Sequence, residues 1–183
     1  MDDIYIKKTL NGDTAAFKYF VCAYKDFAFS LSYSILKNKY LAEECTQLAF
    51  IKAFENLKSF RRDASFKTWL GRIVINLSLR QAEKKEPEPV EEMPENQIAF
   101  VEDSLEGLYE EERKKYITAV FEMLPPQASL ALDLFYLKEN SLQEIAGLTG
   151  WSMSKVKMTL ARGRKSFYSK LNELLKTELK ELR

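Results

Sequence analysis

The sequence predicts an all-α protein built from two helical domains, and three observations support this prediction. Apolar residues recur every three or four positions along most of the chain, as they do on the buried face of a helix. Between Asp13 and Lys85 there is one glycine and no proline, which leaves few residues for the tight turns of an all-β fold. A proline-containing acidic segment separates the two helical parts of the 183-residue chain.

Charge divides the chain into three segments. Residues 1–85 hold 15 basic and 9 acidic residues, residues 86–112 hold 11 acidic and no basic residues, and residues 113–183 hold 13 basic and 7 acidic residues. Self-repulsion and proline should keep the middle segment flexible and extended. We therefore predict two basic domains and an acidic linker that acts either as a spacer or as a nucleic-acid mimic in a partner's positive channel.

The first domain is expected to be a helical bundle. Asn11-Gly12-Asp13 predicts a turn and N-cap before its first long helix. The residues expected to face inward on that helix are Phe17, Phe20, Val21, Tyr24, Phe27, Leu31 and Ile35. Those expected on the second helix are Leu41, Cys45, Leu48, Phe50 or Ile51, Phe54 and Leu57. A third helix is predicted from Phe66 to Arg80, with Phe66 and Trp69 in the core.

The second domain is also expected to be helical. A helix from Leu105 to Leu124 should end at two prolines, and residues 127–138 should form the next helix. Ser141 and Glu144 fit an S-x-x-E capping box, which predicts a short helix that stops at Gly150. A long final helix follows Ser152, with its inward residues being Val156, Leu160, Gly163, Phe167 and Leu171.

Composition excludes several kinds of active site. The chain contains no histidine, so it cannot hold a Ser-His-Asp triad, a Cys-His nucleophile or a zinc site with histidine ligands. Its six scattered glycines form no phosphate-binding loop. We expect no enzymatic activity, no metal and no cofactor.

The start of the chain has no positive flank followed by an apolar stretch, and the longest apolar run, Tyr19 to Tyr24, is too short to span a bilayer. We therefore expect a cytoplasmic protein that does not insert into membranes. Cys22 and Cys45 are expected to be reduced, buried thiols.

The segment from Ser141 to Lys165 predicts a helix-turn-helix that binds DNA. A short capped helix, a glycine turn and a second helix with a basic outer face form the arrangement that places a recognition helix in the major groove. Ser154, Lys155 and Met158 are predicted to reach base edges, with Lys157 beside them. Arg162, Arg164 and Lys165 are better placed for phosphates. The alternative is a helical hairpin with a solvated basic face.

The chain resembles a known family in two separate places. The residues Ala42-Glu43-Glu44, Gln47 and Phe50, followed by Phe66-Lys67-Thr68-Trp69-Leu70, Arg72-Ile73 and Asn76, resemble region two of the extracytoplasmic-function sigma factors. The residues Leu124-Pro125-Pro126-Gln127, Glu144-Ile145-Ala146, Gly150, Val156-Lys157 and Arg162-Gly163-Arg164-Lys165 resemble their region four. The resemblance implies a bacterial transcription initiation factor, with region two in residues 1–85, a linker in 86–112 and region four in 113–183.

The resemblance also implies partners. Glu43, Glu44 and Gln47 would face core RNA polymerase, although acidic residues early in a helix also favour its dipole. Arg61, Arg62, Lys67, Asn76 and Arg80 would help open the downstream promoter element and hold its single strand. The acidic linker would thread into the polymerase channels. The family usually has an anti-sigma factor that clamps both domains.

The sequence departs from the family pattern at two sites. The usual arginine run after Asn76 is interrupted, and Met158, Thr159 and Ala161 stand where polar or basic residues are common. The upstream element is therefore expected to differ from the commonest one.

Two other functions fit the residues. A stand-alone helix-turn-helix regulator would dimerise through its first domain and bind a palindrome without polymerase. A helical adaptor would bind only proteins.

Overall fold

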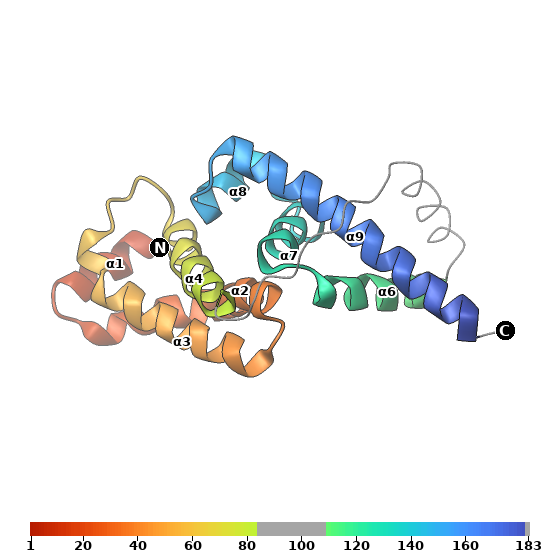
Figure 1. Cartoon of the computed structure of the whole chain (residues 1–183). Helices are drawn as coiled ribbons and strands as arrows, with labels where there is room; N and C mark the ends of the chain where they lie inside the picture. Colours follow the sequence, from red (N-terminus) through yellow and green to blue (C-terminus); the bar gives the residue numbers. More distant parts are fainter. Residues whose placement is uncertain (84–108, 182–183) are drawn as a thin grey trace.

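The chain folds into two helical lobes, which Figure 1 shows side by side. The computed structural model describes residues 1–83 and 109–181. The first lobe consists of α1 (Asp2–Leu10), η1 (Thr14–Phe17), α2 (Lys18–Leu36), α3 (Lys39–Glu55), η2 (Leu57–Ser59) and α4 (Phe66–Ala82). The second consists of α6 (Glu110–Met123), α7 (Pro126–Leu132), η3 (Asp133–Leu137), α8 (Leu142–Thr149) and α9 (Met153–Glu181). No strand occurs within these two described ranges, so the all-α prediction is confirmed there.

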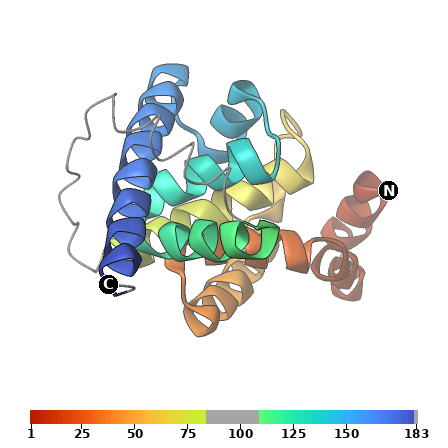
Figure 2. The ribbon, with the colours of Figure 1, turned by 90° about the vertical axis from the view of Figure 1, so that its right-hand side faces the viewer.

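The first lobe is a bundle of α2, α3 and α4, and α1 lies at its edge (Figure 2). Phe20, Leu31, Phe66 and Leu70 are fully or almost fully buried between these helices. Side-chain caps start two of the three long helices: Asn38 accepts from the amide of Leu41 at α3, and Ser65 accepts from the amide of Thr68 at α4. Such caps satisfy backbone N–H groups that have no partner within the helix.

The inward face predicted for α3 is wrong in part. Leu48 and Phe54 are each 41% exposed, and Ile51 is 54% exposed. The buried face instead carries small residues, because Ala42, Ala49 and Ala53 are completely buried. Alanine lets α3 approach its two neighbours closely, and the close packing turns the larger apolar side chains toward solvent.

The predictions for Val21 and Cys22 on α2 are also wrong, because both side chains are exposed, whereas Cys45 is buried as expected. Cys22 lies two residues from the buried Phe20, and two residues rotate a helix by about 200°. This rotation points the Cys22 thiol away from the core.

The second lobe is organised around α9, which packs on α6, α7 and α8. Val156, Leu160 and Leu171 are its deeply buried residues, which confirms the predicted inward face. The helix that begins at Pro126 continues into the π-helical η3, so together they span residues 126–137, and the predicted segment 127–138 is helical up to its last residue.

The two lobes are in direct contact, with α4 against α8 and α2 against α7. Gly71 lies under Leu148, and a Cβ atom at position 71 would be 2.9 Å from the Leu148 Cδ2 atom. The Arg72 Nε atom donates to the Gly147 carbonyl oxygen at 2.5 Å. Lys37 donates a hydrogen bond to the Ser129 hydroxyl across the same boundary.

Most of the predicted acidic linker, residues 86–108, lies outside the described residues. Its last three acidic residues, Glu110, Glu111 and Glu112, form the first turn of α6, where negative charge favours the helix dipole. Among the helices that the structure describes, none is both long enough and apolar enough to cross a bilayer.

Candidate nucleic-acid interface

A capping box and a left-handed glycine build the turn that presents α9. The Ser141 amide donates to the Glu144 carboxylate at 2.8 Å, and the Glu144 amide donates to the Ser141 hydroxyl at 3.2 Å. These bonds confirm the predicted capping box. The Ser141 amide and the Ser141 hydroxyl, which is 2.7 Å from the carboxylate, both donate to Glu144 and lower its pKa. Gly150 ends α8 with a φ of 74°, a conformation that glycine adopts without strain.

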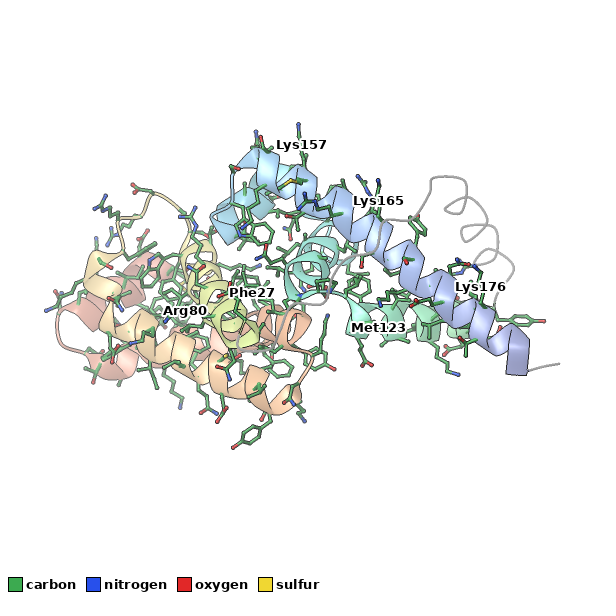
Figure 3. All side chains as sticks on the ribbon, in the orientation of Figure 1. Phe27, Arg80, Met123, Lys157, Lys165 and Lys176 are labelled. Carbon is green, nitrogen blue, oxygen red and sulfur yellow. The ribbon has the colours of Figure 1, made fainter. Side chains whose placement is uncertain are left out.

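The outer face of α9 carries exposed polar and basic residues. Ser154, Lys157 and Arg162 are exposed, as are Met158 and Ala161 between them. Lys157 and Lys165 project from the side of α9 that faces away from both lobes (Figure 3). The face is held rigidly because Val156 and Leu160, on the opposite side of the helix, are anchored in the core.

Three of the predicted DNA-binding residues on α9 are less accessible than the others or are engaged within the lobe. The Lys155 Nζ atom lies 4.7 Å from the centroid of the Trp151 ring, and Lys155 is partly buried. Trp151 is partly buried and packs against the core. The Arg164 Nη1 atom donates to the Tyr136 hydroxyl at 3.3 Å, and Lys165 is partly buried. The freest basic groups of this face are therefore Lys157 and Arg162.

The residues predicted for the downstream element lie in the loop before α4 and on two different sides of that helix. Arg61 and Arg62 lie in that loop and are exposed. Arg62 has a φ of 63°, and its Nε atom is 3.6 Å from the Asp3 carboxylate on α1. Lys67 is exposed, and its Nζ atom lies 4.7 Å from the centroid of the Phe27 ring.

Asn76 and Arg80 are exposed on one side of α4, which we call the basic stripe, whereas Lys67 lies about 180° around the helix from Asn76. Sequence reasoning missed Arg72, which lies four residues before Asn76 and therefore on the same side of the helix. This spacing was visible in the sequence. The structure adds that Arg72 contacts the second lobe, through its bond to the Gly147 carbonyl.

The aromatic residues beside the loop serve the core. The Phe66 ring is 4.1 Å from that of Phe20 between centroids and is 2% exposed. Trp69 is half-buried and lies 5.1 Å from Phe60, which sequence reasoning also missed. This confirms the prediction that Phe66 and Trp69 belong to the core, although Phe60 and Trp69 keep part of their surface beside the basic loop.

A second exposed surface lies on α3 and contains the residues predicted to face the polymerase. Glu43, Glu44 and Gln47 are exposed, and Tyr40 and Ile51 share their side of the helix. The exposed apolar residues were missed because periodicity alone assigned Ile51 as a candidate for the core. An apolar strip with an acidic border is typical of a protein-binding surface.

A groove of about 720 Å³ runs between the lobes and is mainly apolar. Leu41, Leu79 and Ala82 line it from the first lobe, and Met123 and Pro125 line it from the second. Within the described part of the chain, no cluster of three or more acidic or cysteine side chains is arranged to hold a metal ion.

Two family models match the chain, and they cover both lobes. The model of Sigma-70 region 2 matches residues 20–87, and the model of Sigma-70 region 4 matches residues 114–167. The first match includes the exposed α3 surface and the basic stripe, and the second includes the capped α8 and the outer face of α9.

Curated relatives match over almost the whole chain. The ECF RNA polymerase sigma factor SigW of Bacillus subtilis (strain 168) is 31% identical over 179 residues, which cover 92% of this chain and 96% of the relative. The ECF RNA polymerase sigma-E factor of Escherichia coli (strain K12) is 28% identical over 189 residues, with 96% of both chains covered.

Two solved structures share the fold. The sigma factor RpoE in complex with the anti-sigma factor NepR from Bartonella quintana has a TM-score of 0.58 at 21% identity, with 87% of this chain and 96% of that chain covered. CnrH in complex with the cytosolic domain of CnrY has a TM-score of 0.59 at 20% identity, with 95% and 96% covered. With both sigma regions matched in order and a relative 31% identical over nearly its full length, this chain belongs to the extracytoplasmic-function sigma factors of the sigma-70 family.

Proposed function

We propose that this sigma factor binds core RNA polymerase and directs it to promoters by contacting two separate DNA elements. The observation that carries the proposal is the exposed, basic outer face of α9, held in place by the capped α8 and the Gly150 turn. The family membership makes the polymerase the expected partner. The protein itself makes and breaks no covalent bond in this function.

In the proposed complex, α9 enters the major groove of the upstream (-35) element. Residues near the start of a recognition helix reach base edges, whereas basic residues farther along contact phosphates. Ser154, Lys155 and Met158 take the first role. The second role falls to Lys157, Arg162, Arg164 and Lys165.

The loop before α4, Lys67 and the basic stripe of α4 are proposed to contact the downstream (-10) element. The free energy needed to melt the duplex is offset when unstacked bases bind to a surface that combines positive charge with aromatic rings. Arg61 and Arg62 supply charge in the loop that follows the partly exposed Phe60, and Lys67 supplies charge from the first turn of α4. Asn76 and Arg80 supply amide and guanidinium donors along α4.

The exposed face of α3 is proposed to dock on core RNA polymerase. Glu43, Glu44 and Gln47 form its polar border, and Tyr40 and Ile51 provide apolar area to bury. A surface of this composition gains affinity from its apolar centre and orientation from its charges. The proposal implies a cytoplasmic protein, because core polymerase acts in the bacterial cytoplasm.

An anti-sigma factor is a further proposed partner. One structural neighbour is a sigma factor in complex with an anti-sigma factor, and the other is CnrH in complex with the cytosolic domain of CnrY. The groove between the lobes offers apolar surface from both regions, so one bound segment there would hold the lobes together.

Reconstitution with core polymerase tests the proposal. The purified protein is mixed with core polymerase and genomic DNA, and RNA five-prime ends are mapped. We expect a stable complex and transcripts with defined start sites. The absence of both would overturn the proposal.

Two matched measurements separate the proposal from its rivals. A stand-alone regulator would give symmetrical footprints without polymerase, whereas a sigma factor should bind DNA weakly and in a salt-dependent manner when alone. If the protein is an adaptor that binds only proteins, charge reversal at Arg162 or Lys165 should leave its function intact. If it is a sigma factor, the same change should abolish its activity. Lys176→Glu is the control for each single reversal, because it places the same charge change on an exposed part of α9 about 21 Å from Arg162.

A further inference from the structure

Met158 is an exposed apolar side chain at the centre of the outer face of α9. It is 47% exposed, and it is not part of the core cluster to which Val156 and Leu160 of the same helix belong. Burial within the fold therefore does not account for a methionine at this position.

At the centre of this face, Met158 has a longer side chain than its neighbours one turn before and one turn after it. Ser154 lies one turn before it and Ala161 lies one turn after it, and both are small and exposed. Lys157 and Arg162 flank the face, whereas the Lys155 Nζ atom is held over the Trp151 ring. A ligand on this face would meet an apolar tip surrounded by positive charge.

The charge of the helix favours DNA over a protein as that ligand. From Met153 to Asn172 the sequence contains no acidic residue, while five lysines or arginines lie between Lys155 and Lys165. A polyanion is attracted to such a surface, and phosphates can pair with Lys157 and Arg162 while the centre of the face approaches the bases.

The chemistry of the Met158 side chain indicates which DNA base it would contact. The methionine thioether has no hydrogen-bond donor and only a weak acceptor, so it gains little from the polar edges of bases. In the major groove the apolar group is the 5-methyl group of thymine. We propose, on the basis of the function proposed above, that Met158 is a specificity-determining residue that contacts the methyl group of one thymine in the upstream element.

The test first selects upstream sequences with the full chain bound to core polymerase, for the wild type, Met158→Ala and Met153→Ala. Met153 is a matched control, because it is 40% exposed on the same helix but lies about 140° around it from Met158. Each thymine of the selected motif is then replaced by deoxyuridine, which lacks only the methyl group.

We expect deoxyuridine at one position to weaken wild-type binding about fourfold, the change that corresponds to burial of one methyl group. Met158→Ala should be insensitive to that replacement, and Met153→Ala should behave as the wild type does. Met158→Leu should keep the sensitivity and Met158→Gln should lose it, which provides further tests if the alanine variant unfolds.

Two outcomes would overturn the assignment while leaving the sigma function intact. In the first, a motif is selected but no deoxyuridine replacement weakens binding of the wild type. In the second, the deoxyuridine replacements weaken binding of the Met158 variants as much as they weaken binding of the wild type. Loss of polymerase or inhibitor binding by Met158→Ala, with its DNA preference unchanged, would assign the side chain to a protein partner and also overturn it. Failure to select any motif would instead contradict the proposed function itself.

Discussion

Lys37 is unusual, because its charged amine lies at the boundary between the two lobes. It ends α2 in the left-handed conformation, donates to the Ser129 hydroxyl and lies 5.5 Å from the Phe121 ring centroid. Burial lowers its pKa from the ordinary 10.5 to about 8, although Asp133 and Glu122 oppose this shift. Desolvation of the ammonium group therefore outweighs the attraction of the two carboxylates.

This shift predicts a pH dependence. Between pH 8 and 10.5 the unfolded chain binds more protons at Lys37 than the folded chain does, so the free energy of unfolding should rise with pH in that window. Thermal unfolding of the wild type and of Lys37→Met is the measurement, and the difference between them isolates this residue. We expect the wild type to gain stability relative to Lys37→Met as pH rises. If the stabilities of the two proteins change in parallel from pH 7 to 10, the Lys37 amine is solvated and the assignment of its pKa shift is wrong.

At the scale of the element, α8 shows how much a short helix depends on its ends. It has eight residues, too few to be stable alone, and its start is fixed by the reciprocal bonds of Ser141 and Glu144. Because α8 supports α9, loss of the cap should affect the DNA-binding face as well as the stability of the second lobe.

Ser141→Ala should destabilise the second lobe by about 1 kcal/mol, the usual effect of removing a serine N-cap. Chemical denaturation followed by circular dichroism measures this loss. Because the pKa of Glu144 is lowered in the folded state, the cap's contribution to the free energy of unfolding depends on pH. It is present above the ordinary pKa of 4.5 and is lost as pH falls below that value. Ser154→Ala, an exposed substitution within α9, is the control and should leave stability nearly unchanged.

At the scale of the whole molecule, the main feature is the contact between the lobes. Gly71 allows Leu148 to approach α4, and Arg72 donates to the Gly147 carbonyl. The proposed function assigns the two lobes to two separate promoter elements, so we expect promoter binding to part them.

Arg72→Glu should favour the separated state, because a carboxylate cannot donate to the Gly147 carbonyl and instead repels it. Arg72 is exposed, so the change should not unfold either lobe. We expect small-angle X-ray scattering to show a radius of gyration larger by several ångströms than that of the wild type. Arg80→Glu makes the same charge change on an exposed position of α4 two turns farther along. Equal radii for both variants would mean that this bond does not hold the lobes together.

The sequence by itself determined the helices, their order and the exposed basic face of α9. These features depend on local interactions: the capping box at Ser141, the glycine at position 150 and the three- and four-residue spacing that buries Val156 and Leu160. The same periodicity could have identified Arg72 as a neighbour of Asn76.

Only the tertiary structure decided which side of α3 is buried, where Lys155 points and how the lobes meet. Ile51 is exposed because close packing selected the alanine face, and Lys155 is drawn to Trp151 by a ring that the turn brings near. Gly71 contacts Leu148 although they are far apart along the chain. Local patterns report the conformation of a segment, whereas these contacts depend on which surfaces fit together after the helices have formed.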